Sequence, residues 1–369
     1  MGPVGGEIAR DPGLFFVKIL FIRRDNIGDL VCTTPAVRAV RAAFPRVRIG
    51  ALVNTYNADA LLGNPDVDDV YTYEKAKHAA GRSLVSTLAR NASLIGRIRA
   101  ARYDWAIGCG SASARLARYV LMTGAARRVG FTAGAGGGWF RSYTDPLPEP
   151  GDGLHEVERT FRLLAPLGVA GAPPPMRLFP DVACVDAVRR ALGGAPADRS
   201  GPLVAFHISS RRPENRWPVE RFVALGRVLL AHGARILLLW SPGGERNVFH
   251  PGDDGEAEAI RRDLGEGVLT FPTERLRELV AALSEADLVV CGDGGAMHAA
   301  AALGKPMVVI WGRTDPARWR PWGTPHVLLR AESRRAADVA PESVAEAVVR
   351  MLGDRPLDAS NPVAGAPSR

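Results

Sequence analysis

Short apolar runs alternate with longer stretches of mixed apolar and polar residues along most of the chain. In the first half, runs rich in β-branched and aromatic residues predict strands at 15–22, 48–53, 70–73 and 104–108. Stretches in which apolar residues recur every three or four positions predict helices at 29–43, 84–101, 112–121 and 155–167. Strands that alternate with helices favour a parallel sheet with helices on both faces.

The second half repeats this rhythm after a proline-rich connector between Val169 and Pro180. Strands are predicted at 203–208, 235–240, 268–271, 288–291 and 307–311, and helices at 219–232, 275–285, 296–303 and 342–352. We therefore expect an α/β protein with two doubly wound domains facing a cleft. The predicted organisation is a first domain at 1–170, a linker region at 171–199, a second domain at 200–354 and a disordered tail at 355–369.

Length and composition agree with two soluble domains. The chain has 369 residues, 47% of them hydrophobic and 23% charged, which excludes a disordered or fibrous protein. The four cysteines lie far apart without a C-x-x-C pair, so reduced thiols in the cytoplasm are expected. The longest apolar run, 14–22, is too short to span a bilayer, and residues 1–11 lack the apolar centre of a signal peptide.

The charge is distributed unevenly between the two halves. The net charge of +8 lies entirely in the first 150 residues, where 17 Arg and 3 Lys face 12 acidic residues. A basic half could meet nucleic acid, anionic lipid headgroups or an acidic small substrate. The alternative is a solvated surface that reflects a preference for arginine codons.

The first candidate loop follows the first strand and contains Gly28 and Asp29. Ligands of open α/β sheets bind at the carboxyl ends of strands, so Asp29 would place a carboxylate at a binding edge. The structural alternative is a helix cap or first-turn acid. Because Pro35 lies inside the predicted helix, we expect a helix to begin there, with Thr33 or Thr34 as its cap.

The second candidate loop follows the strand at 288–291 and opens a helix. It contains Asp293, Gly294, Gly295 and His298, and its free backbone N–H groups would bind phosphate. It lacks the Gly-Lys-Ser/Thr ending of a Walker loop, and a tight structural turn explains the same glycines.

A third segment follows the strand at 203–208, where Ser209, Ser210 and Arg216 offer hydroxyls and a guanidinium suited to a diphosphate. Exposed arginines without a ligand are the structural alternative. The sequence Asp66-Val67-Asp68 has the spelling of a metal-binding D-x-D motif, but it follows Asn64-Pro65, and we interpret it as a turn.

Together these segments resemble glycosyltransferase family 9, the lipopolysaccharide heptosyltransferases. The opening "ILFIRRDNIGDLVCTTPAVRAVRAAFP" and the later "VVCGDGGAMHAAAALGKPMVVIWGRTDP" carry the resemblance, together with "NPDVDDVY", "LHEVERTFRLLAPLG" and "RWPVERFVAL" between them. The resemblance covers about residues 16–330 in the family's order. It implies the GT-B fold, with the acceptor bound by the first domain and the nucleotide-sugar by the second, and transfer with inversion and without a metal or other cofactor.

The resemblance also assigns roles on the acceptor side. Asp29 matches the general base that acts on the acceptor hydroxyl, and Asp25 is the next candidate. We expect Gly28, Arg23 and Arg24 near the bound acceptor.

On the donor side, Asp293, Gly295 and His298 match the family's donor loop, while Gly294 replaces its usual threonine. Ser209 and Ser210 match a hydroxyl pair, and Arg216, with Asn215 as the alternative, stands in for a phosphate-binding lysine. Glu274 falls where the family contacts the nucleotide base, at a position often held by an apolar residue, so the donor base and the heptose stay open.

The resulting expectation is a cytoplasmic enzyme, peripheral at the inner face of the membrane, that moves a heptose to an anionic glycolipid such as lipopolysaccharide. One alternative keeps the mechanism but uses another nucleotide-sugar and a small soluble acceptor. A second alternative is a non-catalytic protein that binds nucleotides or nucleic acid. The absence of RNA-binding motifs argues against it.

Overall fold

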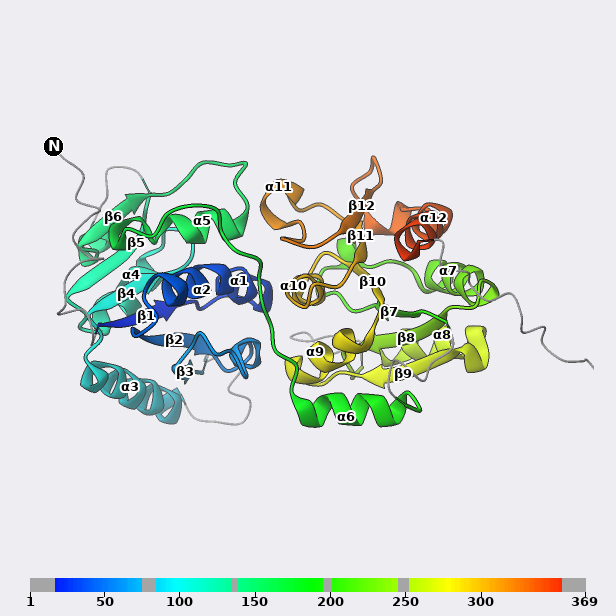
Figure 1. Ribbon diagram of the computed structural model, residues 1–369, viewed down its shortest axis with the longest axis horizontal. Helices are drawn as coiled ribbons and strands as arrows, with labels where there is room; N and C mark the ends of the chain where they lie inside the picture. Colours follow the sequence, from blue (N-terminus) through cyan, green and yellow to red (C-terminus); the bar gives the residue numbers. More distant parts are fainter. Residues whose placement is uncertain (1–16, 75–83, 134–137, 195–200, 245–251, 354–369) are drawn as a thin grey trace, which may run out of the picture. The chain divides into compact units, whose positions relative to one another are not determined.

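The computed structural model describes residues 17–74, 84–133, 138–194, 201–244 and 252–353. The chain divides into two compact units (Figure 1). The first comprises Met1–Phe179 with Pro316–Gly323, and the second comprises Pro180–Asp315 with Thr324–Arg369. Segment 316–323, expected within the second domain, thus belongs to the first unit. Residues 1–11 and the expected tail at 355–369 lie outside the described residues.

The first unit is built on a six-stranded sheet in the order β3-β2-β1-β4-β5-β6, in which every neighbouring pair is parallel. The strands are β1 (Lys18–Ile22), β2 (Arg48–Asn54), β3 (Asp69–Tyr73), β4 (Trp105–Gly108), β5 (Arg127–Thr132) and β6 (Asp145–Pro148). The first four were predicted, whereas β5 and β6 were missed because arginines and prolines interrupt their apolar pattern.

Helices cover both faces of this sheet (Figure 1). On one face, α2 (Thr34–Ala43) and the region of α5 (Glu156–Arg162) pack on Ile19 and Phe21 of β1. On the other, α3 (Leu84–Ala101) and α4 (Ala114–Met122) pack on Leu20 and Ile22. This division follows from the alternation of side chains along a strand.

The predicted helix at 29–43 is two helices, α1 (Ile27–Val31) and α2. Thr33 is the residue before α2 and Pro35 stands in its first turn, as the sequence predicts. The predicted helix at 155–167 ends early, at Arg162, and a 3₁₀ turn, η7 (Ala165–Leu167), follows it with Pro166. Proline cannot continue the hydrogen-bond ladder of an α-helix, which accounts for the break.

The second unit repeats the topology of the first. Its sheet has the order β12-β11-β10-β7-β8-β9, again with every neighbouring pair parallel. The strands are β7 (Leu203–His207), β8 (Arg235–Trp240), β9 (Val268–Pro272), β10 (Leu288–Gly292), β11 (Met307–Trp311) and β12 (His326–Arg330). Read in chain order, both sheets follow the 3-2-1-4-5-6 arrangement of dinucleotide-binding folds.

The helices of the second unit are α6 (Val182–Ala191), α7 (Val219–Ala231), α8 (Asp254–Leu264), α9 (Leu276–Glu285), α10 (Gly295–Ala302) and α12 (Pro341–Leu352). Helix α6 lies in the range expected to be a linker, and an ion pair between Arg189 and Glu285 at 3.1 Å ties it to α9. The fold prediction of two doubly wound α/β units is confirmed, whereas 171–199 is more than a connector.

Three smaller predictions can also be compared with the structure. All four cysteines are free thiols. The segment at 65–66 is a turn, and Asp68 pairs with Arg41 at 2.6 Å, so the D-x-D spelling serves a structural contact. No helix among the described residues combines the length and apolar character that crossing a bilayer needs.

Candidate functional site

The strand order places one candidate loop at the switch point of each sheet. In the first unit, β1 and β4 are neighbours from which the chain winds in opposite directions, and residues 23–29 follow β1. In the second unit, β7 and β10 hold the same positions, and Ser209 and Asp293 follow them. Ligands of open α/β sheets bind at this crevice, so both loops lie where the fold favours a site.

Asp29 stands in the first turn of α1 with both carboxylate oxygens engaged. Arg23 Nη2 lies 2.6 Å from Oδ1, and the backbone N–H and side-chain amide of Asn26 donate to Oδ2 at 3.0 and 3.1 Å. Burial by itself would raise the pKa of this carboxyl, but the charge of Arg23 and the Asn26 bonds outweigh it and hold the pKa below its usual value. Asp29 is therefore both a helix-start acid and an ionised, partly exposed carboxylate.

Arg23 is buried, with 2% of its side chain exposed. Its guanidinium meets Asp29, Glu156 at 2.9 Å and Asp25 at 3.3 Å. Burial acts to lower the pKa of Arg23, but the three carboxylates raise it, so the group stays charged. The expected direct contact between Arg23 and an anionic acceptor does not fit this burial, because the charge is already enclosed by acids.

Glu156 is a functional candidate that the sequence reasoning missed. It opens α5, is 2% exposed and accepts from Arg23, and Arg318 of α11 (Pro316–Trp319) lies 2.9 Å from its other oxygen. Arg318 also donates to Ser111, which follows β4, at 3.3 Å. Glu156 thus joins the loop after β1 to segment 316–323 within the first unit. Only its place in the family-like stretch "LHEVERTF" could have drawn attention to it.

Segment 316–323 has a second anchor in the first unit at His155. The His155 ring stacks on Trp322 with 4.7 Å between ring centres, and its Nε2 lies 2.8 Å from the carbonyl oxygen of Arg320. Burial lowers the pKa of this imidazole. The segment that carries Arg318 is therefore held in place independently of the ion pair with Glu156.

Arg24 and Gly28 complete the first loop. The Arg24 guanidinium lies over the rings of Tyr119 and Tyr73, at 3.9 and 5.0 Å, and its carbonyl accepts the Tyr73 hydroxyl at 3.0 Å. Gly28 is buried inside α1, where its carbonyl accepts from Cys32. Arg24, in contrast to Arg23, makes no ion pair with a described carboxylate.

In the second unit, Gly294 has extended backbone and precedes α10, which begins at Gly295, one residue before the predicted start. The Asp293 carboxylate accepts a hydrogen bond from the Thr314 hydroxyl at 2.5 Å. The side-chain amide of Asn215 donates to the backbone carbonyl of Asp293 at 3.3 Å. Burial raises the pKa of Asp293, although Thr314 and the nearby charge of Arg212 oppose it. His298 is buried on α10.

The structure brings Asn215, rather than Arg216, to the donor-like loop. Asn215 is 5% exposed and packs against Gly312, where a Cβ would come within 2.2 Å of the amide oxygen. Arg216 donates to the Ser210 carbonyl at 2.9 Å and pairs with the buried Asp253 at 2.7 Å. The guanidinium expected to hold phosphate is thus engaged by the protein itself, and Arg212 is the cation whose charge reaches Asp293.

The remaining predicted residues lie on loops of the same sheet edge. Ser209 Oγ accepts the backbone N–H of Ser241 at 2.8 Å, and Ser210 Oγ accepts that of Arg212 at 3.3 Å. Glu274 follows β9, and its side chain is exposed. Thr314 was missed by the sequence reasoning, because only its contact with Asp293 shows its importance.

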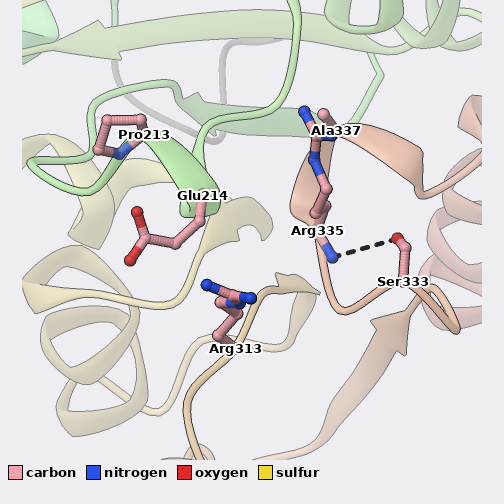
Figure 2. Close-up of a pocket in the computed structure, with 6 residues that line it drawn as sticks. All are labelled: Pro213, Glu214, Arg313, Ser333, Arg335 and Ala337. Atoms are coloured by element: carbon pink, nitrogen blue, oxygen red, sulfur yellow. Dashed lines mark hydrogen bonds between the residues drawn. The ribbon is translucent and has the colours of Figure 1, made fainter.

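Figure 2 shows a hollow beside the loops that carry Asn215 and Thr314, the two residues that contact Asp293. Its volume is about 380 Å³. Its lining residues are Pro213, Glu214, Arg313, Ser333, Arg335 and Ala337. Glu214 directly precedes Asn215, and Arg313 directly precedes Thr314. The hollow offers two guanidinium groups and one carboxylate beside the donor-like loop. Among the described residues, no group of three His, Cys, Asp or Glu side chains is arranged to hold a metal ion.

Comparisons with known proteins agree on one family. The profile of "Glycosyltransferase family 9 (heptosyltransferase)" matches residues 91–348. Lipopolysaccharide heptosyltransferase 3 of Escherichia coli is 24% identical over 303 residues, which cover 80% of this chain and 83% of that protein. A family 9 glycosyltransferase structure from Veillonella parvula matches with a TM-score of 0.79 at 17% identity, covering 91% of this chain and 97% of that one. The structure of E. coli ADP-heptose lps heptosyltransferase II matches with a TM-score of 0.74 at 19% identity, covering 91% and 98%.

Proposed function

Because the chain belongs to glycosyltransferase family 9 and is therefore a sugar-transferring enzyme with a GT-B fold, we propose that it transfers a heptose from a nucleoside-diphosphate donor to a hydroxyl of a lipopolysaccharide core. The names of its relatives, a lipopolysaccharide heptosyltransferase and an ADP-heptose transferase, support this substrate class. The observation that carries the proposal is the ionised Asp29 at the switch point of the first sheet.

In this proposal Asp29 is the general base on the acceptor. The acceptor hydroxyl becomes acidic as its oxygen bonds to the sugar carbon, so even a carboxylate with a lowered pKa can accept the proton late in the reaction. Such proton transfer contributes on the order of 10²–10⁴-fold to the rate. Arg23 acts through Asp29, which it keeps ionised and oriented. Glu156 acts one step further away, because it holds Arg23 in place, and neither residue touches the acceptor.

The donor is assigned to the loops at the switch point of the second sheet. Negative charge grows on the leaving phosphate as the glycosidic bond breaks, and the free N–H groups of Gly294 and Gly295 at the start of α10 would stabilise it. Removing one such donor from comparable sites costs about 2.7–4 kcal/mol. We assign the accompanying positive charge to Arg212, because Arg216 is held by Asp253.

The carboxylates of Asp29 in the first unit and Asp293 in the second have distinct tasks in this proposal. Asp29 would take the proton of the acceptor hydroxyl, whose oxygen attacks the sugar carbon, while Asp293, held by Thr314, would bind donor hydroxyls. Direct displacement of the phosphate by the activated hydroxyl gives inversion at the sugar carbon. No step of this scheme requires a metal or another cofactor.

A second candidate function keeps this chemistry with another nucleotide-sugar and a small soluble acceptor. Gly294 in place of a threonine and the exposed Glu274 after β9 favour it, since both alter the donor side. In either case we propose that the enzyme acts in the cytoplasm, and with a glycolipid acceptor at the inner face of the membrane.

The deciding experiment is a thermal-shift panel of ADP-, GDP- and UDP-sugars, followed by transfer to a lipopolysaccharide core and determination of the product's anomeric configuration. A matched donor stabilises the protein by RT ln(1 + [L]/Kd), so the preferred base gives the largest rise in Tm. We expect ADP-heptose to give that rise and the product to be inverted. Stabilisation by another sugar nucleotide, without transfer to the core, would favour the second candidate.

A further inference from the structure

The positive charge of the chain is concentrated in one stretch of the first unit. Residues 84–144 contain nine arginines and a single acidic residue, Asp104, so their net charge of +8 equals that of the whole protein. This stretch runs from α3 through β4, α4 and β5 to a 3₁₀ turn, η6 (Gly138–Ser142). The charge asymmetry is therefore a property of one part of the fold rather than of the whole basic half.

The helices of this stretch form one outer layer of the first unit (Figure 1). Leu94 and Ile98 of α3 and Leu116 and Val120 of α4 pack into the same buried cluster against β1. Arg115 and Arg118 stand opposite Leu116 and Val120 on α4, because a helix turns by about 100° per residue. Arg97 and Arg99 are two positions apart on α3 and flank its buried side on either side, Arg97 towards Tyr71 and Arg99 towards Gly124, after the end of α4. Exposed arginines here are Arg97, Arg99, Arg115 and Arg118, and Arg141 of η6 is exposed as well.

These five arginines lack acidic partners among the residues that the structure describes. Elsewhere in the same stretch, Arg127 pairs with Asp145 and Arg90 with Glu74, so neutralised arginines occur beside them. Arg97 and Arg118 instead lie against aromatic rings, Arg97 at 5.8 Å from the centre of Tyr71 and Arg118 at 4.6 Å from that of Trp139. The unneutralised charge is thus directed outward.

Large apolar side chains are exposed within the same layer. Trp139, Leu121 and Met122 are 47%, 44% and 38% exposed, respectively. Leu121 and Met122 form the end of α4, and the cation–π contact with Arg118 places Trp139 beside that helix. Tryptophan and aliphatic residues surrounded by arginines are typical of surfaces that rest in the headgroup region of a bilayer.

We propose that this arginine-rich face, formed by Arg99, Arg115, Arg118 and Arg141 with Leu121, Met122 and Trp139, docks the protein on the phosphate headgroups of an anionic bilayer. The arginines attract the anionic surface, and the three apolar side chains insert among the headgroups. A nucleic-acid ligand would not use such insertion. The inference rests on the proposed function in one respect: docking brings the enzyme to its acceptor only if that acceptor lies in the membrane.

The test is co-sedimentation of the full-length protein with vesicles of phosphatidylcholine alone or mixed with phosphatidylglycerol. Each basic residue near an anionic surface strengthens binding by about fivefold. The double variant Arg115→Gln/Arg118→Gln is therefore expected to bind the mixed vesicles about 25-fold more weakly. Leu121→Ser/Met122→Ser should weaken binding while leaving its salt dependence unchanged.

The matched control is Arg227→Gln/Arg350→Gln, which removes two exposed arginines from α7 and α12 of the second unit. We expect it to bind like the wild type. An equal loss of vesicle binding in Arg115→Gln/Arg118→Gln and Arg227→Gln/Arg350→Gln would overturn the proposal. So would wild-type binding that is as tight to neutral as to mixed vesicles, or tighter to single-stranded DNA than to mixed vesicles at the same salt concentration.

Transfer to a deacylated, soluble acceptor separates this inference from the proposed function. The Arg115→Gln/Arg118→Gln protein should keep wild-type turnover on that acceptor, because neither residue lies in the proposed site. A wild-type protein that binds anionic vesicles but transfers no sugar would refute the proposed function and leave the docking face standing.

Discussion

The guanidinium of Arg23 lies 2.6 Å from the carboxylate of Asp29, and this ion pair is almost enclosed by the first unit. The two residues are six positions apart: Arg23 directly follows β1, and Asp29 stands in the first turn of α1. Asp29 is therefore both the acid at the start of α1 and the proposed general base. The contacts that orient α1 also keep its carboxylate ionised. The most direct tests of the proposed site act on this pair.

Asp29→Asn is expected to lower turnover by about 10²-fold or more, because the amide cannot accept the acceptor's proton. Donor binding should stay near the wild-type value, and Tm should fall only modestly, because Arg23 retains Glu156 and Asp25. Steady-state kinetics and donor thermal shift measure both. The matched control is Asp25→Asn, which removes a half-exposed carboxylate from the same guanidinium and should stay active. If Asp25→Asn loses turnover and Asp29→Asn keeps it, Asp25 is the base.

The pH dependence of kcat/KM should depend on the charge of Arg23. Because the pKa of Asp29 is lowered, its acid limb in kcat/KM is expected below the ordinary aspartate value of about 3.9. The stability that Asp29 contributes should likewise be present above that value and be lost as the pH falls through its lower folded-state pKa. Arg23→Met should move the kinetic limb to higher pH, whereas Arg23→Lys should leave it close to wild type.

Arg23→Met also removes the cation of Asp29 and one of the cations of the buried Glu156, which keeps Arg318. Breaking a buried ion pair in this way typically costs about 3–5 kcal/mol. The pH profile of kcat/KM is therefore measured at a temperature below the Tm of each variant. An acid limb that is the same in all three proteins would show that Arg23 does not control the ionisation of the base.

Thr314→Val is expected to weaken donor binding most strongly near neutral pH. The lost hydroxyl removes a hydrogen bond that opposes the burial of Asp293, so the raised pKa of Asp293 should rise further. A raised carboxyl pKa means that the folded protein is less stable when the group is ionised, so the Tm deficit should shrink on acidification. Thr314→Ser keeps the hydroxyl and should restore donor KM; failure of this rescue would assign the effect to packing of the methyl group.

Arg212 and Arg216 should separate donor binding from stability. Arg212 is exposed, so Arg212→Gln is expected to raise donor KM with little change in Tm. Arg216→Gln removes the ion pair between Arg216 and the buried Asp253 and should destabilise the protein by about 1–3 kcal/mol, with a smaller effect on donor KM. The reverse pattern would return the phosphate-binding role to Arg216.

Glu274→Met tests the donor base. If the exposed side chain after β9 faces the base, the substitution should change the ratio of kcat/KM for ADP- and GDP-linked donors. Glu278 on the same helix start provides a structural control, since it accepts the backbone N–H of Glu274 and should affect Tm instead. An unchanged ratio would place Glu274 outside the base contact.

The local pattern of the sequence determined most of the framework. Hydrophobic periodicity located nine of the twelve strands that the described residues form. Thr33 and Pro35 marked the start of α2, and the glycines after β10 marked the start of α10. These features depend on residues a few positions apart, so they can be inferred without knowing the neighbours in space. For the same reason the candidate loops were found, because each directly follows an apolar run.

Only the tertiary structure decided what surrounds each functional side chain. Arg23 was expected beside an anionic acceptor, but Glu156, 133 residues later in the chain, is the neighbour that encloses it. Thr314 became important, and Asn215 was placed beside Asp293, because β7, β10 and β11 are adjacent in the sheet. Burial and charge pairing arise from such long-range neighbours, and because strand order sets them, no local pattern in the sequence contains them.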